Sequence, residues 1–211
     1  RKHANLRLRQ YGSCSRCCTS RPNGNGVVVP ESSFDELIVA MKDGAGILQQ
    51  AEIRFVLGGG LSAWARGGPK SEHDVDFLLQ PDDADAALAA FDAAGWTTER
   101  PPEGWLYKTW HENGALVDLI FNPASGPITS DIIERSPIAE VMALRINVST
   151  LEDVLTAKLM AMTEQEPDYS AVLEWARALR EQIDWDVVRK RTEASPFAKA
   201  FFTLVEELRV V

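Results

Sequence analysis

Two aspartates separated by one residue are the first feature of this chain that could do chemistry. Asp74 and Asp76 lie in Glu72-His-Asp-Val-Asp-Phe-Leu-Leu79, which has the alternating pattern of a β-strand. Side chains alternate between the faces of a strand, so both carboxylates are expected on one face. Like charges this close repel each other, and a divalent cation between them removes the penalty. We therefore expect a metal site, although an Asp-x-Asp pair is also found at solvated strand ends.

A glycine-rich turn precedes these aspartates. Gly58, Gly59 and Gly60 follow the apolar run Ile53–Leu57 and precede a predicted helix. Glycine has no Cβ, so backbone N–H groups at such a turn can approach an anion closely. A phosphate is the expected guest, held by Gly59 and Gly60, although many such turns are only tight connections. Ser62 could donate a hydrogen bond to the phosphate or could satisfy a backbone group.

A third aspartate interrupts an apolar strand. Asp118 lies in the middle of the run Gly114–Phe121. An ionised carboxylate is costly to bury without a partner. Asp118 therefore requires a cation or a strong hydrogen-bond donor, and a salt bridge to a nearby lysine or arginine is the structural alternative.

These motifs together resemble the signature of the DNA polymerase β-like nucleotidyltransferase superfamily. The resemblance is carried by Phe55-Val-Leu-Gly-Gly-Gly-Leu-Ser-Ala-Trp64 followed by His73-Asp-Val-Asp-Phe-Leu-Leu79, a glycine turn and then Asp-x-Asp. It covers roughly residues 34 to 183 and is closest to the AbiEii-like and MenT-like enzymes, many of them toxins of toxin–antitoxin pairs. The resemblance implies transfer of a nucleoside monophosphate from an NTP co-substrate to an acceptor hydroxyl, with release of pyrophosphate.

The same resemblance implies roles for the three carboxylates. Val117-Asp-Leu-Ile120 resembles the strand that carries the third carboxylate of these enzymes. Asp74, Asp76 and Asp118 would then hold two Mg²⁺ ions, which neutralise charge on the attacking and leaving oxygens. Asp118 would also act as the base for the acceptor hydroxyl.

Two more residues are implied by the resemblance. Lys158, in Leu151-Glu-Asp-Val-Leu-Thr-Ala-Lys-Leu-Met-Ala161, resembles the lysine with which these enzymes bind the triphosphate; the alternative is a surface lysine lying along apolar neighbours. Asp168 corresponds to the acidic residue that opens the next helix and would contribute to nucleotide binding. Thr163–Pro167 departs from the family because it lacks the expected basic residues. Asp168 could instead be only a helix N-cap.

The acceptor is less well defined by the sequence. The resemblance implies a toxin-type enzyme that acts on tRNA 3′ ends and is restrained by a cognate antitoxin protein. Residues 1 to 29 hold six of the 22 basic residues and no acid, so the rest of the chain has 16 basic residues against 31 acidic ones. Such an acidic body favours a cationic acceptor, for example an aminoglycoside. A catalytically silent nucleotidyltransferase fold that serves for binding is the third interpretation.

Composition limits the class of protein. A chain of 211 residues, 45% apolar, can bury a core of one domain with an appendage or of two small domains. No run approaches 18 apolar residues and the N-terminus lacks an apolar signal region, so we expect no membrane partner and a cytoplasmic location.

The pattern predicts three regions, and the resemblance implies the fold class of the second one. Residues 1–30 are expected to be a disordered basic tail whose Cys14, Cys17 and Cys18 are free thiols, the alternative being a zinc site with His3. Residues 31–148 are expected to form an α/β nucleotidyltransferase core with a mixed central sheet flanked by helices. Residues 149–211 are expected to form a C-terminal helical bundle.

Periodicity and capping signals predict the elements of the two folded regions. A capping box at Ser33 opens a helix that is expected to run to about Gly44, and a second capping box opens a helix at Ser149. The other expected helices begin near Leu61 and span 82–95, 131–135, 168–183, 184–194 and 196–210. The expected strands are 53–57, 74–79, 96–99, 105–111, 114–121 and 141–148.

Several polar and aromatic residues near the motifs have two interpretations each. Arg66 and Lys70 could reach a triphosphate or could be solvated loop cations. His73 is expected to face away from both neighbouring aspartates and to hydrogen-bond another element. Trp105 and Tyr107 could stack on a base or sugar, or could pack against the core.

Overall fold

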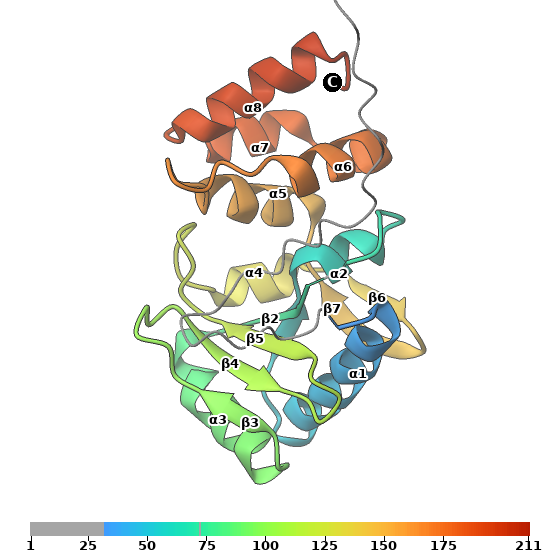
Figure 1. Cartoon of the computed structure of the whole chain (residues 1–211), viewed down its shortest axis with the longest axis vertical. Coiled ribbons are helices and arrows are strands. Elements are labelled where there is room, and N and C mark those ends of the chain that lie inside the picture. The colour runs from blue at the N-terminus through green and yellow to red at the C-terminus, as the bar shows by residue number, and fades with distance from the viewer. Residues whose placement is uncertain (1–31, 72) are drawn as a thin grey trace, which may run out of the picture. The chain divides into compact units, whose positions relative to one another are not determined.

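The computed structural model describes residues 32–71 and 73–211 (Figure 1). The predictions for residues 1–30, with their cysteines, lie outside this range. The described strands are β1 (Phe55–Leu57), β2 (Val75–Leu79), β3 (Thr97–Glu99), β4 (Leu106–Trp110), β5 (Leu116–Ile120), β6 (Ile138–Val141) and β7 (Leu144–Val148). The described α-helices are α1 (Phe34–Gln50), α2 (Gly59–Trp64), α3 (Ala84–Ala93), α4 (Ser130–Arg135), α5 (Leu151–Met160), α6 (Ser170–Leu179), α7 (Trp185–Arg191) and α8 (Pro196–Glu207), with short 3-10 helices η1 (Pro81–Asp83) and η2 (Arg180–Gln182).

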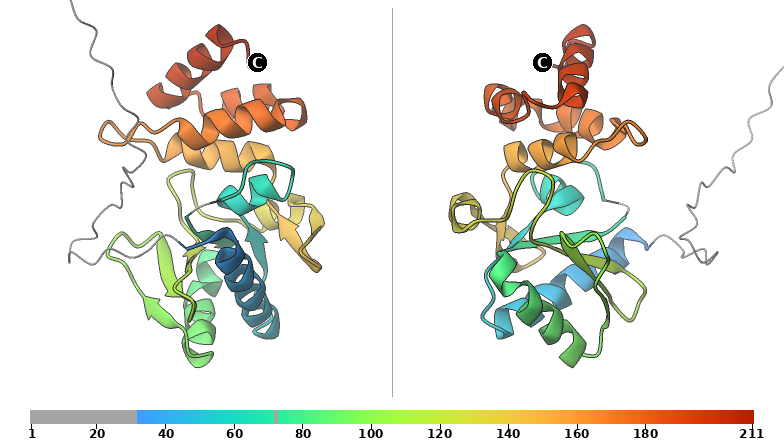
Figure 2. Two further views of the ribbon diagram at one scale, coloured as in Figure 1. Left: turned by 45° about the vertical axis from the view of Figure 1, so that its right-hand side comes forward. Right: turned by 90° about the vertical axis from the view of Figure 1, so that its left-hand side faces the viewer.

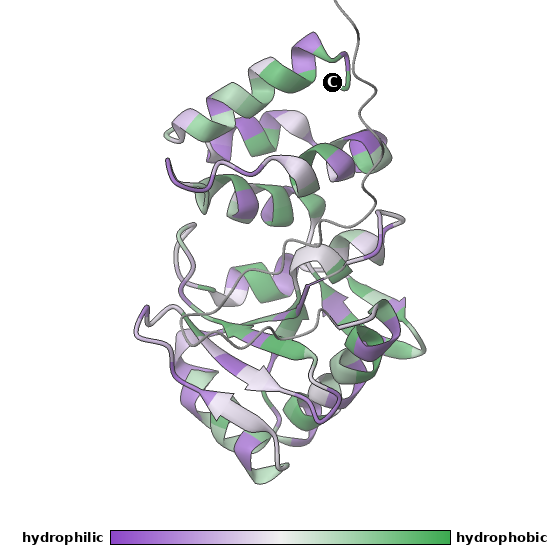
Figure 3. Ribbon diagram, in the orientation of Figure 1, coloured by the Kyte–Doolittle hydropathy of each residue, from purple (hydrophilic) through white to green (hydrophobic). Residues whose placement is uncertain are grey.

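The described strands form one mixed sheet, which confirms the predicted α/β class. Their order is β3-β4-β5-β2-β1-β7-β6. The pairs β2–β5 and β1–β7 are parallel and the other neighbours are antiparallel. Figure 3 shows that β5, near the middle of the sheet, is apolar along most of its length, whereas β4 is much paler. The carboxylate-bearing strands are therefore inner strands.

The two faces of the sheet bury different groups. Helices α1 and α3 pack against one face, to which Val75, Phe77 and Leu79 of β2 contribute fully buried side chains. Alternation along the strand turns Asp76 and Leu78 to the opposite face. That second face is only partly covered by protein, and it carries the site described below.

Helix α1 is longer than the sequence predicted. It begins at the expected capping box, in which Ser33 Oγ accepts from the Glu36 N–H and the Glu36 carboxylate accepts from the Ser33 N–H, but it continues past Gly44 to Gln50. A Cβ at Gly44 would lie 2.9 Å from a ring carbon of Phe77. The glycine lets the helix approach the sheet closely, so tertiary packing overrides its weak helix propensity.

The predicted strand 141–148 is wrong in its extent. The structure has a hairpin instead, with β6 and β7 joined at Met142 and Ala143, whose φ angles are 49° and 68°. Neither residue type is typical of a turn with positive φ, so this reversal could not be predicted from local sequence. The consequence is an additional edge strand, β6.

Helices α5 to α8 pack together around a second apolar cluster (Figure 2). Apart from Ala63, the buried members of this cluster fall between Leu151 and Val210. The start of α5 differs from the prediction by one residue, because Thr150 is the N-cap and its hydroxyl accepts from the Asp153 N–H. Within the part of the chain that the structure describes, no helix is both long and apolar enough to span a bilayer.

Candidate active site

Three carboxylates converge on the less covered face of the sheet. Asp76 and Asp118 are directly paired in the parallel register of β2 and β5, and Asp74 lies just before β2. One carboxylate oxygen from each of the three lies within 4.8 Å of the other two. The structure thus brings together residues separated by more than forty positions, as the sequence analysis required.

Burial of these carboxylates disfavours their ionised forms. Desolvation raises the pKa of Asp76 well above its usual value, and the neighbouring charges of Asp74 and Asp118 raise it further. Burial also raises the pKa of Asp74 and brings that of Asp118 to about 6. A compact set of hard, mutually repelling oxygens is the donor set that Mg²⁺ prefers. The three residues therefore fit a divalent cation.

Lys108 is a nearby cation that the sequence analysis did not identify. It is the cross-strand partner of Asp118 in the β4–β5 hairpin, and its Nζ lies 3.3 Å and 3.4 Å from the two carboxylate oxygens. Its charge opposes the effect of burial on the pKa of Asp118. The structure shows the salt bridge to a lysine that the sequence analysis gave as one alternative for Asp118, and the metal-binding role stays a prediction. Counting the hairpin register from its turn near Asn113 would have identified this pair.

The glycine turn is built against the carboxylates. Gly59 has a φ of +49°, and a Cβ at this position would overlap Oδ2 of Asp76. A Cβ at Gly60 would lie 2.6 Å from the Ser71 hydroxyl. A side chain at Gly59 would therefore occupy the place of the Asp76 carboxylate, and one at Gly60 would press on Ser71 at the cavity wall.

Ser62 does not join this surface. It is fully buried, and its hydroxyl donates to the Gly59 carbonyl at 2.8 Å. Of the two roles considered for it, the structure shows the backbone contact.

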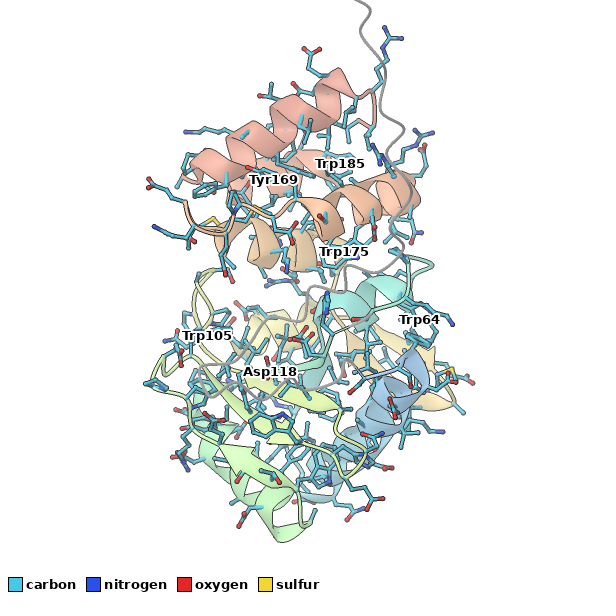
Figure 4. The ribbon with its side chains drawn as sticks, viewed as in Figure 1. Trp64, Trp105, Asp118, Tyr169, Trp175 and Trp185 are labelled. Carbon is cyan, nitrogen blue, oxygen red and sulfur yellow. The ribbon has the colours of Figure 1, made fainter. Side chains whose placement is uncertain are left out.

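A cavity of about 1080 Å³ opens over the carboxylates. Its lining includes the three aspartates, Gly59 and Gly60 on one side and residues of α5 and α6 on the other. Figure 4 shows Asp118 on the sheet and Trp175 on the helical side, with Trp105 at the flank. Trp105 lines the cavity and is 38% exposed, whereas the Tyr107 hydroxyl bonds Asp85 and Arg100 instead. The volume is sufficient for a nucleotide together with part of an acceptor.

Lys158 and Asp168 both lie in the cavity lining. Lys158 is exposed on α5, and its charge lowers the pKa of Asp74 and Asp76, opposing their burial. Asp168 precedes α6, and its Oδ1 accepts from the Ser170 N–H at 2.9 Å. The N-cap of α6 is Tyr169, so the interpretation of Asp168 as the N-cap is wrong, although its carboxylate bonds the first residue of the helix.

The other polar residues near the motifs divide between structural and cavity positions. Arg66 donates to the carbonyls of Val148 and Ser149, so it ties α2 to the end of β7 rather than extending into the cavity. Lys70 lines the cavity and lies over the Phe34 ring. The prediction for His73 is wrong, because β2 begins only at Val75 and the alternation does not extend back to it. His73 lines the cavity and lowers the pKa of Asp74.

Comparison with known proteins identifies the family to which this chain is similar. A family model described as "Nucleotidyl transferase of unknown function (DUF2204)" matches residues 37–206. No curated protein matches the sequence.

Solved structures share the fold at low sequence identity. The solution structure of the antibiotic-resistance factor ANT(2'')-Ia is 13% identical, with a TM-score of 0.56, over 84% of this chain and 99% of that one. A crystal structure of ANT(2'')-Ia with adenylyl-2''-tobramycin is also 13% identical, with a TM-score of 0.52, over 80% and 99% of the two chains. A putative nucleotidyltransferase from Thermotoga maritima is 16% identical, with a TM-score of 0.50, over 62% and 87%. At these identities the likeness establishes the fold alone.

Proposed function

Because this chain belongs to the nucleotidyltransferase family DUF2204, we propose that it moves a nucleoside monophosphate from an NTP to an acceptor hydroxyl and releases pyrophosphate. The observation that supports this most strongly is the convergence of Asp74, Asp76 and Asp118 beside the glycine turn, at the floor of a large cavity. A structural ion pair does not need three carboxylates this close together, whereas metal-dependent phosphoryl transfer can use such a cluster to hold its cations.

The three aspartates would hold the metal, and we propose that two Mg²⁺ ions bind there. A bound divalent cation supplies a Lewis acid that neutralises charge on the transferred phosphoryl group and the leaving pyrophosphate. Gly59 and Gly60 would present backbone N–H groups to the phosphates, and Lys158 would bind the triphosphate from α5. Asp168 is proposed to support nucleotide binding from the start of α6.

Asp118 is the proposed general base. Burial raises the pKa of Asp118 to about 6 in the metal-free protein, and a bound cation would lower it. The role of base therefore rests on the position of this carboxylate at the floor of the cavity, where an acceptor hydroxyl can reach it. The acceptor oxygen would lose its proton to Asp118 and attack the α-phosphorus. The bond from that phosphorus to the bridging oxygen of the β-phosphate would break, and pyrophosphate would leave with the bonding electrons.

We propose tRNA 3′ ends as the acceptor and an AbiEii-like or MenT-like toxin role, with a cognate antitoxin as partner, in the cytoplasm where both co-substrates occur. This proposal is supported by the motif resemblance around Gly58–Gly60 and Asp74–Asp76. A small cationic acceptor such as an aminoglycoside is the second candidate. It is favoured by Glu174 and Asp168, which add carboxylates to the α6 side of the cavity.

A labelling experiment tests these assignments. The protein is incubated with each α-labelled NTP, Mg²⁺ and either total tRNA or an aminoglycoside, and Asp76→Asn serves as the inactive control. Label on RNA supports the first candidate, and label on the aminoglycoside supports the second. Failure to bind any NTP in the presence of Mg²⁺ would favour a catalytically silent fold.

A further inference from the structure

Two arginines at the side of the cavity share one carboxylate. Arg135 of α4 donates to both oxygens of Asp153, at 3.1 Å from Nε and 2.7 Å from Nη2. Arg191 of α7 donates to Oδ1 of the same residue at 2.8 Å. Asp153 is largely buried, with its side chain 13% exposed, whereas the two guanidinium side chains are 40% and 38% exposed. All three residues line the cavity that contains the carboxylate cluster.

This arrangement leaves positive charge and hydrogen-bond donors at the cavity wall. Each guanidinium has five N–H donors, and the bonds to Asp153 use only some of them. Asp131, one turn earlier on α4, adds a weaker electrostatic attraction to Arg135 and does not line the cavity. Thr156, one turn after Asp153 on α5, also lines the cavity, and its buried hydroxyl has no partner within the described residues. Such a group of donors suits a phosphate oxygen.

An apolar wall, formed by two strand residues and one helix residue, lines the same cavity. Leu78 and Ile120 each lie two residues beyond a site aspartate on the same strand face, about 7 Å farther along the strand. Ile132 lines the cavity on α4, one turn before Arg135. A ligand that fills the cavity can therefore meet carboxylates, aliphatic side chains and guanidinium groups.

We propose that Arg135 and Arg191 form a phosphate subsite for the acceptor, which would make the preferred acceptor a polynucleotide. A 3′-terminal nucleotide has a hydroxyl to place at Asp118, a base or sugar to cover the apolar wall and a phosphodiester to reach the arginines. A polycationic acceptor would be repelled at the arginine end. This inference rests on the proposed function, in which the NTP phosphates are held at Gly59 and Gly60.

Direct binding measurements test the subsite. The trinucleotide CpCpA and its uncharged methylphosphonate analogue are titrated into wild-type protein, Arg191→Gln and the control Arg177→Gln, which removes an exposed charge outside the cavity. Arg191→Gln should weaken CpCpA binding about tenfold or more and reduce the salt dependence by about 0.7 in log–log slope, with no further effect on the analogue. The control should leave CpCpA binding near the wild-type value apart from a small screened effect.

Other outcomes would overturn the subsite. If Arg191→Gln weakens binding of a non-hydrolysable NTP but not of CpCpA, the arginines serve the nucleotide instead. If neither affinity changes while the thermal midpoint falls, they form a structural ion pair. Arg135→Lys is a second variant. It keeps the positive charge and partial pairing with Asp153, but it loses the bidentate hydrogen-bond geometry of the guanidinium.

The proposed function is tested by a separate measurement. Failure of the wild-type protein to transfer labelled nucleotide to tRNA would contradict the proposed tRNA acceptor, and failure with every acceptor would contradict the proposed transfer reaction. Absence of CpCpA binding by wild-type protein, or an unchanged KM for tRNA in Arg191→Gln, overturns the subsite even when that transfer occurs.

Discussion

Asp76 and Asp118 are direct neighbours in the parallel pairing of β2 and β5. A slip of one residue in this register would turn Asp118 into the α1–α3 face of the sheet, where an ionised carboxylate would meet only apolar side chains. The register is therefore what creates the site. The hydrophobic alternation on both strands, with Val75 and Val117 paired on the buried face, makes that register strongly preferred.

Asp76→Asn should reduce nucleotidyl transfer by about a thousandfold or more, because it removes a metal ligand from the centre of the cluster. The metal-free variant should unfold at a temperature no lower than the wild type, since a neutral amide relieves repulsion from Asp74 and Asp118. Turnover and thermal midpoint are measured together. Asp92→Asn, an exposed substitution on α3, is the control, and near wild-type turnover of Asp76→Asn would refute the site.

Gly59→Ala should abolish metal binding and transfer, because its methyl group would overlap the Asp76 carboxylate. Gly114→Ala is a matched control. Gly114 also has a positive φ, 90°, but a Cβ there meets nothing within 4 Å. Both variants should lose about 1 kcal/mol of stability or more from backbone strain, and only Gly59→Ala should lose Mn²⁺ binding in a calorimetric titration. Equal Mn²⁺ affinities would contradict the proposed role of the turn.

Lys108→Met should shift metal binding to higher pH. The lysine charge lowers the pKa of Asp118, so its removal lets burial raise that pKa further and more protons compete with the metal. Mn²⁺ affinity measured from pH 5 to 8 checks this expectation. Lys42→Met, an exposed change on α1, should leave the profile unchanged, and identical profiles for all three proteins would exclude an influence of Lys108 on the site.

Arg66→Ala should lower stability by about 2 kcal/mol without raising the KM for NTP, because its guanidinium bonds the Val148 and Ser149 carbonyls. Lys70→Ala should raise the KM for NTP without lowering stability, because Lys70 lines the cavity and is not bonded into the sheet. Chemical denaturation and steady-state kinetics on both variants separate the two roles. A larger KM effect for Arg66→Ala than for Lys70→Ala would mean that Arg66 reaches the nucleotide.

Stability of the metal-free protein should fall as pH rises from about 5 to 7. The folded pKa of Asp118 is about 6 and that of Asp76 is raised well above its usual value, whereas both titrate near 3.9 when unfolded. The folded state therefore binds more protons than the unfolded state in this interval, so the free energy of unfolding decreases with pH. Thermal unfolding in EDTA should show this trend. Mg²⁺ should counteract it, and Asp118→Asn should flatten it.

Local patterns in the sequence, together with the motif resemblance, were sufficient for the fold class, the glycine turn and the three candidate carboxylates. Alternation along β2 and β5 predicts which residues share a face, because the side-chain period of a strand is fixed by its backbone. The capping box at Ser33 likewise predicts where α1 begins, since the bonds that define it are made within one turn. These features depend on neighbours only a few residues apart.

Tertiary structure alone decided which distant groups meet. Gly44 continues α1 because Phe77 packs against it, Met142 and Ala143 reverse the chain without a turn signal, and Arg66 bonds the end of β7. The pairing of Arg135 and Arg191 on Asp153 joins three helices, and no periodicity in the sequence relates them. Such contacts depend on how elements pack across the core, and packing is determined by the whole set of side chains rather than by local spacing.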